Sequence, residues 1–358
     1  MTRWTLIALA FALAAPAAAA DGIGTAGSFR SVGWAQCDAP YDQWKQGACD
    51  PAPVEPQLSG PALAQAHIER AIALLAQMRV SEAAKAAEAA VALDRTNVAA
   101  LAFRGRVLLT MLNFDEAERN SNAGLLIEPG HPALLAARAE ALLGMSKPHQ
   151  ALADISAAVS KQPYDADMLW IKARIHLNLG QVERAESALG VGLSREPTNR
   201  RLLTMRAQAR LRLGKFQGAA ADATQVLAIS ISDPTAREVR AIASIALGRT
   251  EEAVEDLNAL LGEPGEVGPA VTTKHNRELL FQRAILNAQL KRLGSAAADV
   301  ETLMSAGGKQ AVLRVQLYLR QHGFPDIRLD GDRSQRLNDA LKACIVDRAC
   351  SGGLTQHL

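Results

Sequence analysis

The chain has 358 residues, more than one compact core usually takes, which predicts two domains or one extended array. Apolar residues make up 49% and aromatic residues 4%, so burial must depend on Ala, Leu, Val and Ile, a composition that excludes a disordered chain and favours close helix packing. Lys and Arg number 39 against 37 Asp and Glu, a net charge of +2; this near balance, with so few aromatic residues, argues against a nucleic-acid partner.

Residues 1–20, MTRWTLIALAFALAAPAAAA, have the pattern of a secretory signal peptide: basic Arg3, an apolar run and three small residues at the end. A retained membrane anchor is the alternative, but this apolar run is short against the roughly 20 residues that span a bilayer. No cysteine stands at the predicted cleavage point before Asp21, so a lipid-modified N-terminus is not expected. We therefore expect export to the periplasm, with no stable membrane insertion after cleavage.

Residues 21–61 form a Pro-rich segment that contains two of the four cysteines. Cys37 with Cys49, and Cys344 with Cys350, are local pairs in a chain bound for an oxidising compartment, which predicts two disulfides. Neither spacing is of the CxxC type, so a zinc or redox site is not expected. Six helical residues rise about 9 Å, beyond the usual disulfide Cα separation of about 4.4 to 6.8 Å. The helix that contains Cys344 should therefore end before Cys350.

The middle of the chain repeats every 34 residues. Each period predicts two helices, in which small residues twelve positions apart let the helices approach closely. Gly residues are expected just past the ends of three first helices, and Pro residues at the entry to the next unit. The series are Ala83, Ala117, Ala151, Ala185, Ala219 and Ala253; Ala71, Gly105, Ala139, Ala173, Ala207 and Ala241; Pro129, Pro163 and Pro197; and the expected helix-ending Gly180, Gly214 and Gly248.

This pattern resembles the tetratricopeptide repeat, which has small residues at its eighth, twentieth and twenty-seventh positions and Pro at its thirty-second. One unit matches at Gly105, Ala117, Gly124 and Pro129, and the next two units match at the equivalent places. Arg95 departs from the pattern because it stands where the first Pro is expected. The resemblance implies an all-α solenoid of helical hairpins over residues 62–306, with about five clear repeats. A sixth, degraded pair is expected from Arg277 to Met304, after a Gly- and Pro-containing linker.

The resemblance further implies that the first helices line a concave face that binds a protein or peptide. Trp170 and Arg174 are the best candidates on that face, because an aromatic ring and a guanidinium one helical turn apart are a common pairing at binding hot spots. Trp170 as ordinary core is the alternative, although Leu169 already fills the core position. The Lys and Asn of the family's carboxylate clamp are absent. The equivalent positions of other first helices give weaker candidates: Arg106, Glu140 and Gln208.

Catalytic and cofactor-binding signatures are absent apart from one nominal match. GIGTAG at residues 22–27 fits GxGxxG, but it follows the signal peptide rather than a buried strand, so a phosphate loop is not expected. The seven His residues have no metal-ligand spacing, and no GxSxG occurs. The sequence therefore predicts a non-enzymatic protein with no cofactor and no metal.

Residues 309–358 depart from the 34-residue period. Val312, Val315 and Leu319 share a helical face, Gly323 is expected to end that helix, and Asp330 with Gly331 is expected to form a turn before a second helix with Leu337 and Leu341 on its face. This helix-turn-helix pattern resembles the small peptidoglycan-binding module of bacterial envelope proteins. Three departures put glycan contacts in doubt and leave a docking module or a solenoid cap as alternatives: Ser334 for Gly, Leu337 for Thr and Cys344 for an aromatic residue.

The predicted function is an exported scaffold or adaptor that binds a protein or peptide on its concave face in the bacterial cell envelope. The alternative is a wall-associated protein that binds peptidoglycan through residues 309–358 and uses the repeats as a spacer.

Overall fold

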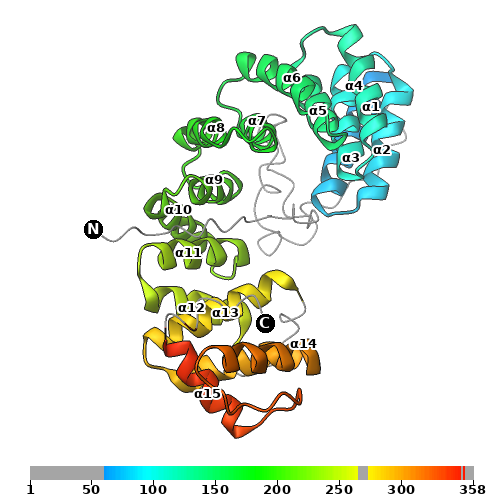
Figure 1. The fold of residues 1–358 in the computed structure, drawn as a ribbon. Coiled ribbons are helices and arrows are strands. Elements are labelled where there is room, and N and C mark those ends of the chain that lie inside the picture. Colours follow the sequence, from blue (N-terminus) through cyan, green and yellow to red (C-terminus); the bar gives the residue numbers. More distant parts are fainter. Residues whose placement is uncertain (1–59, 265–272, 348–349, 351–358) are drawn as a thin grey trace. The chain divides into compact units, whose positions relative to one another are not determined.

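The computed structural model describes residues 60–264, 273–347 and 350, and all regular structure in these ranges is α-helical (Figure 1). This confirms the predicted all-α class. The predicted signal peptide, the Cys37–Cys49 disulfide and the GIGTAG segment lie outside the described residues. Among the described helices, none combines the length and apolar character that crossing a bilayer requires.

Contacts divide the chain into two compact units, and the boundary in the sequence lies between Asp167 and Met168. The first unit contains α1 (Gly60–Ala76), α2 (Val80–Leu93), α3 (Val98–Thr110), α4 (Phe114–Ile127), α5 (Pro132–Gly144) and α6 (Pro148–Lys161). Helix α7 (Ala166–Asn178) begins at the end of the first unit and continues into the second. The second unit continues with α8 (Val182–Arg195), α9 (Arg200–Arg212), α10 (Phe216–Ile229), α11 (Pro234–Ala246), α12 (Thr250–Leu261), α13 (Lys274–Gln289), α14 (Leu293–Gln321) and α15 (Gln335–Val346).

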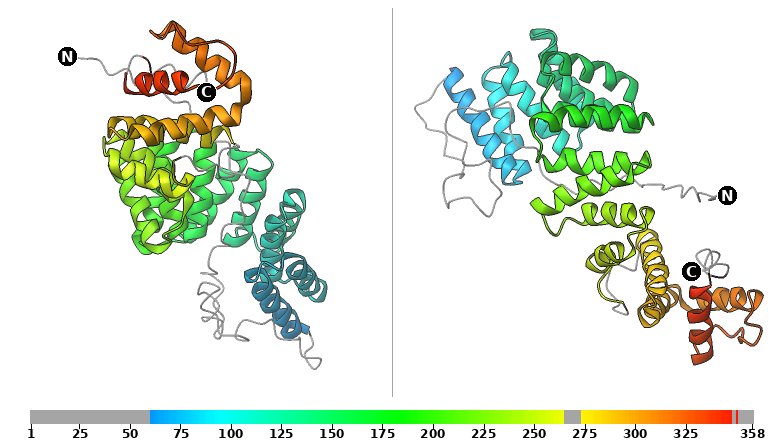
Figure 2. Two further views of the ribbon diagram at one scale, coloured as in Figure 1. Left: turned by 90° about the horizontal axis from the view of Figure 1, so that it is seen from below. Right: turned by 90° about the vertical axis from the view of Figure 1, so that its left-hand side faces the viewer.

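Within each unit, consecutive helices pack as antiparallel hairpins around the small residues of the 34-residue period (Figures 1 and 2). Both alanine series are buried, and Ala83, Ala117 and Ala151 have no exposed surface. Gly124 shows why a small residue is needed at the twenty-seventh position, because an added Cβ would lie 2.4 Å from the Cδ1 of buried Leu134 on the next first helix. The sixth pair predicted from Arg277 to Met304 corresponds to α13 and the first part of α14, with buried Ala284 and Ala296 twelve positions apart.

The turn between the two helices of a pair uses one residue in the left-handed backbone region. The predicted Gly180, Gly214 and Gly248 follow α7, α9 and α11 with φ of 72°, 69° and 72°, as expected for glycines past a helix C-terminus. In the first unit the same position is occupied by larger residues: Met78, Leu112 and Ser146 have φ of 59°, 58° and 59°. A left-handed conformation disfavours any residue with a Cβ, so these turns are strained.

An arginine on the first helix reaches a residue 16 positions later on the second helix in five of the pairs. Four of these are two-pronged ion pairs between a guanidinium and an aspartate, with N–O distances from 2.6 to 2.9 Å, and Arg104 with Asn120 is a weaker version at 3.3 Å. The ion pairs are Arg138–Asp154, Arg206–Asp222, Arg240–Asp256 and Arg283–Asp299. These ion pairs join the two helices of four of the described hairpins, each within its own repeat.

Residues 309–347 pack on the last helices of the second unit rather than separately from them. Helix α14 contains a break at Gly308. This position lies between residue 306, where the repeat array was predicted to end, and residue 309, where the terminal module was predicted to begin. Helix α15 contacts both α13 and α14, and Leu337 belongs to the same buried cluster as Leu303. The C-terminal residues thus cover the apolar side of the last helices, which is what a solenoid cap does.

Candidate protein-binding surface

Trp170 lies near the start of α7 and is partly exposed, whereas neighbouring Leu169 is 2% exposed and fills the core position. Two guanidinium groups lie over its indole ring. The Cζ of Arg174, one helical turn along α7, is 4.4 Å from the ring centroid. The Cζ of Arg201, from α9 of the next repeat, is 4.1 Å from it. Both distances are within the range of cation–π attraction.

Arg201 was not predicted from the sequence. It stands at the second position of its repeat, within a run of basic residues that looks like an ordinary solvated helix face. Its contact with Trp170 depends on first helices of neighbouring repeats lying side by side, and this places the second position of one repeat near the fifth position of the repeat before it. The register of the repeats could therefore have indicated this contact, because Arg201 stands 31 residues after Trp170.

Several interactions fix α9, which presents Arg201. The side chain of Asn199 accepts a hydrogen bond from the backbone N–H of Leu202 at 3.2 Å and so caps the helix. Farther along, Arg206 and Arg210 both donate to the carboxylate of Asp222, which is 1% exposed. Arg210 also donates to Glu186 of α8, so three helices are joined at this point.

The weaker predicted residues are spread over both units. Gln208 lies on α9, partly buried, two turns after Arg201. Arg106 on α3 and Glu140 on α5 belong to the first unit, and both are partly buried. The structure thus brings Trp170, Arg174 and Arg201 together in one unit and describes Arg106 and Glu140 in the other.

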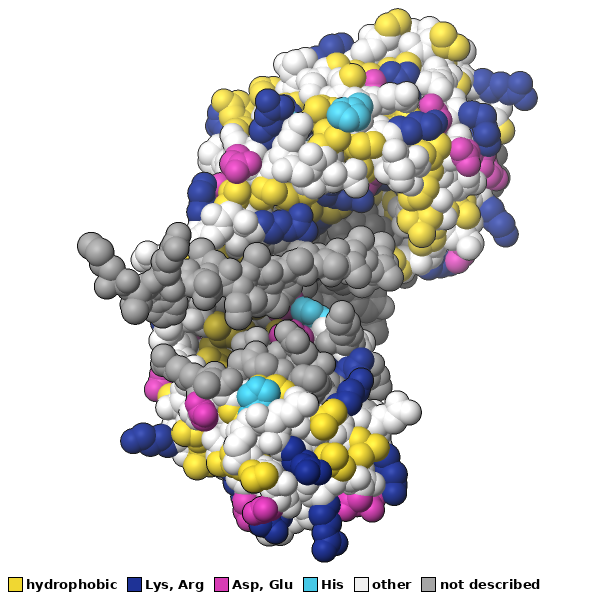
Figure 3. All heavy atoms as spheres, in the orientation of Figure 1, with side chains coloured by type: hydrophobic (Ala, Val, Ile, Leu, Met, Phe, Trp, Pro, Cys, Tyr) yellow, Lys and Arg dark blue, Asp and Glu magenta, His cyan; other side chains and the backbone are white. Residues whose placement is uncertain are grey.

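Charged side chains on the face shown in Figure 3 are mixed in sign among apolar ones, and no continuous basic stripe crosses its described residues. Among the described residues, no group of three His, Cys, Asp or Glu side chains has the arrangement of a metal site. This surface consists of an aromatic ring with two guanidinium groups against it.

The predicted Cys344–Cys350 pair forms a disulfide in the structure, with a Cα–Cα distance of 5.1 Å. Helix α15 ends at Val346, before Cys350. The hydroxyl of Tyr318 donates to the carbonyl oxygen of Cys350 at 2.5 Å. This contact ties Cys350 back to α14.

The turn at Asp330 and Gly331 is held by one buried side chain, Gln316 of α14. Its Nε2 donates to Asp330 Oδ1 at 2.9 Å and to the Asp332 carbonyl at 2.8 Å, while its Oε1 accepts from the Gly331 N–H at 3.0 Å. Gln316 therefore serves the architecture of the turn, and its amide is fully used there.

Residues 136–191 and 204–267 match the model of the tetratricopeptide repeat family. Within these two stretches, about a third of the chain, the helix pairs are similar to tetratricopeptide repeats. Solved structures agree on the fold: the type IV pilus biogenesis factor PilW has a TM-score of 0.50 at 18% identity, covering 56% of this chain and 92% of that one. The Cut9 and Hcn1 hetero-tetramer of APC/C has a TM-score of 0.54 at 14% identity, covering 62% and 42%.

TTC0263, a tetratricopeptide repeat protein of Thermus thermophilus, has a TM-score of 0.45 at 20% identity and covers 51% of this chain and 98% of that one. At these identities the likeness concerns the fold. No curated protein has a sequence significantly similar to this chain. Tetratricopeptide repeats form a protein-interaction fold, and the surface around Trp170 lies within it.

Proposed function

We propose that this protein is an exported, non-enzymatic scaffold or adaptor that binds a protein or peptide at Trp170, Arg174 and Arg201 in the bacterial cell envelope. The observation that carries the proposal is the Trp170 cluster: a partly exposed aromatic ring with two guanidinium groups over it, on first helices of a tetratricopeptide-repeat fold. Aromatic and arginine side chains are the residues in which interface energy is most often concentrated.

The chemistry of the cluster defines the part of a partner that it fits. The ring offers apolar area, and guanidinium groups bind carboxylates with two parallel hydrogen bonds. An acidic or aromatic peptide segment suits this surface better than a basic one, because a Lys or Arg side chain would meet two positive charges.

The proposal is tested with a version of the mature protein in which Trp170 is the single tryptophan, made by Trp34→Phe and Trp44→Phe. Titration with proteins or peptides enriched from the envelope should shift Trp170 emission. The Arg174→Gln and Arg201→Gln variants, which retain the indole, should weaken binding at least tenfold with unchanged helicity. Arg212→Gln, on the last turn of α9, is the matched control and should bind normally. Binding that is unaffected by Arg174→Gln and Arg201→Gln together would show that the partner docks elsewhere.

Export is a separate part of the proposal and rests on the signal-peptide pattern of residues 1–20. Expression of the full chain in a Gram-negative host, followed by osmotic shock, should release a mature protein that begins at Asp21. Retention of residues 1–20 in the cytoplasmic fraction would contradict it.

Peptidoglycan binding through residues 309–358 is the alternative function, and the sequence pattern of these residues supports it. The mature protein would be sedimented with isolated sacculi under oxidising conditions. Absence of the protein from the pellet would leave residues 309–358 as a cap for the last repeats. Because the terminal helices share a core with α13, the full chain must be used rather than one truncated after Ala306.

A further inference from the structure

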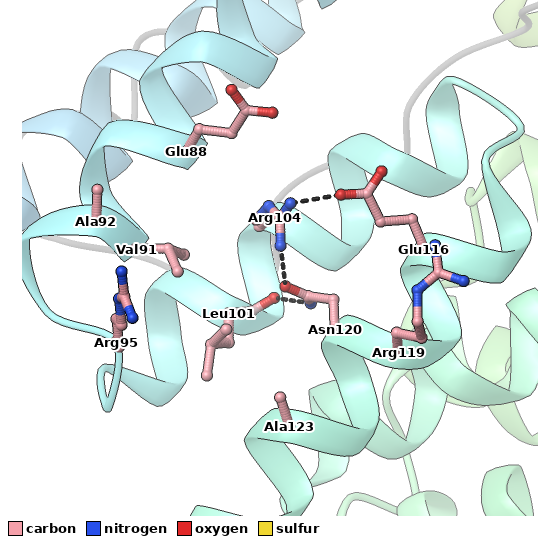
Figure 4. A pocket seen from close by; sticks show the side chains of 10 residues that line it. All are labelled: Glu88, Val91, Ala92, Arg95, Leu101, Arg104, Glu116, Arg119, Asn120 and Ala123. Atoms are coloured by element: carbon pink, nitrogen blue, oxygen red, sulfur yellow. Dashed lines mark hydrogen bonds and ion pairs between the residues drawn. The ribbon is translucent and has the colours of Figure 1, made fainter.

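The first unit contains a pocket that is formed mainly by its second helices. It has a volume of 480 Å³ and lies between α2 and α4, with residues of α3 at its base (Figure 4). Apolar side chains line its middle, among them Val91, Leu101 and Ala123. Neither the repeat fold nor the Trp170 surface accounts for it.

Three arginines line this pocket, and one is already engaged. The guanidinium of Arg104 donates to Glu116 Oε1 at 2.5 Å and to Asn120 Oδ1 at 3.3 Å. Arg95 and Arg119 are exposed and form no hydrogen bond or ion pair with any described residue. In Figure 4 they come from opposite sides of the pocket, with the apolar side chains between them.

Charge in the pocket favours an anion. Glu116 is neutralised by Arg104, and Glu88 is the one other acidic residue of the lining, so Arg95 and Arg119 leave an excess of one positive charge. Two separated guanidinium groups with apolar surface between them fit two carboxylates that flank an apolar stretch. Arg95 is also the residue that replaces proline: the next three repeats have Pro129, Pro163 and Pro197 at this position.

A segment with this pattern precedes α1 in the same chain. Residues 50–55 read DPAPVE, with Asp50 and Glu55 at the ends and four apolar residues between them. Two prolines favour an extended conformation of about 3.1 Å per residue, which separates the two carboxyl-bearing residues by roughly 16 Å and reduces the entropy lost on binding.

Chain connectivity brings this segment within reach of the pocket. Helices α1 and α2 form an antiparallel hairpin, so Gly60 at the start of α1 lies at the end where α2 finishes at Leu93. Arg95 follows two residues later. The five residues from Glu55 to Gly60 span up to about 17 Å when extended. A tether of this length gives an effective concentration in the millimolar range, so two charge pairs suffice for binding.

We propose that residues 50–55 of this chain bind in the pocket between α2 and α4, with Glu55 paired to Arg95 and Asp50 paired to Arg119. The binding is intramolecular and is independent of the Trp170 surface. It gives the segment before the repeats a fixed position on the first unit.

Hydrogen exchange of the full mature chain, followed by mass spectrometry of peptides covering residues 50–59, tests this proposal. The wild type should exchange slowly there. Arg95→Glu should accelerate exchange about tenfold or more, as expected for the loss of a charge-assisted hydrogen bond. The charge swap Arg95→Glu with Glu55→Arg should restore protection. Lys85→Glu is the control, because Lys85 is an exposed cation on α2 that does not line the pocket.

Two outcomes would overturn the proposal. One is exchange of residues 50–59 at the unprotected rate in the wild type. If a free DPAPVE peptide or another acidic peptide then protects α2 and α4 when it is added, the pocket serves a separate partner. The other is wild-type protection that persists in the Arg95→Glu, Arg119→Glu double variant, which would place the segment somewhere else.

Discussion

Arg283 of α13 and Asp299 of α14 form an ion pair that is closed off from solvent, with exposed fractions of 1% and 0%. Arg283 Nε donates to Asp299 Oδ2 at 2.9 Å and Nη2 donates to Oδ1 at 2.6 Å. The third nitrogen of the guanidinium donates to Asn258 Oδ1 at 3.1 Å and to the Gly262 carbonyl. Every nitrogen that carries the charge therefore has a partner, which is the condition for burying it.

Removal of one partner should destabilise the second unit strongly. Arg283→Met leaves the Asp299 carboxylate buried without its cation, so the free energy of unfolding should fall by about 3 to 5 kcal/mol. Urea unfolding followed by circular dichroism measures the loss. The Arg283→Met, Asp299→Leu double variant should regain part of it, because no uncompensated charge remains. Arg336→Ala is the control: its pair with Asp326 is 67% and 72% exposed and should contribute less than about 1 kcal/mol.

Leu112→Gly should stabilise the first unit. Leu112 has a φ of 58° and is 62% exposed, so it is strained and contributes little packing. A left-handed residue with a Cβ costs about 1 to 2 kcal/mol, and the chain entropy of glycine costs roughly 0.5 to 1 kcal/mol, so a gain of up to about 1.5 kcal/mol is expected. Thermal unfolding of the variant beside the wild type provides the measurement.

The reverse change tests the same argument in the second unit. Gly214→Ala, at φ of 69° with nothing within 4 Å of the added Cβ, should destabilise by about 1 kcal/mol through backbone strain alone. Gly190→Ala lies within a helix, also with open space, and should instead stabilise by about 0.8 to 1 kcal/mol. Equal effects at Gly214 and Gly190 would mean that the turn conformation is not the cause.

Stability of the second unit should decrease below neutral pH because of His176. Burial lowers the pKa of His176 below its usual value of 6.5, an effect that exceeds the stabilisation of the cation by Gln181. The unfolded chain then binds a proton first, so stability is full above pH 6.5, falls as the pH drops below it, and levels off once the folded protein also binds the proton. Urea unfolding at about pH 7.5 and about pH 5 should show a smaller difference for His176→Gln than for the wild type.

Loss of the Cys344–Cys350 disulfide should loosen the end of the chain. Chain entropy for so short a loop predicts about 2 kcal/mol. In the Cys344→Ala, Cys350→Ala variant the hydrogen bond from Tyr318 to the backbone carbonyl of residue 350 is left without the covalent link, so amides of α15 should exchange faster, while those of α9 and α10 should be unchanged. Unaltered exchange in α15 would mean that packing of Leu337 and Leu341 alone holds this helix.

The helix pairs were predictable because close helix contact leaves room for little more than Ala or Gly, and that requirement repeats at a fixed spacing. Ala117 and Ala151 are therefore visible in the sequence and buried in the structure. The left-handed turns were predictable where glycine occupies them, as at Gly180, but not at Met78 or Leu112, because neither residue type indicates that conformation.

The ion pairs and the Trp170 cluster were harder to predict from the sequence, for a different reason. Arg206 and Asp222 are 16 positions apart in the sequence, but charged residues on helices are common. Only the register of the helical hairpin shows that these two side chains meet. Arg201 contacts Trp170 of the preceding repeat, and the periodicity of a single helix does not predict a contact between repeats. The pocket beside Arg95 depends on three helices together.

The ion pairs 16 residues apart also bear on how the array avoids misassembly. Because four repeats contain the same Arg–Asp pair, the guanidinium of Arg206 could bind the carboxylate of Asp256 in the following repeat as well as that of its own Asp222. What distinguishes them is the length of chain to be closed, 50 residues against 16. Loop-closure entropy favours the shorter loop by only about 1 kcal/mol. The correct Arg–Asp pairs are therefore selected mainly by the order in which the residues meet during folding, since the shorter loop closes first.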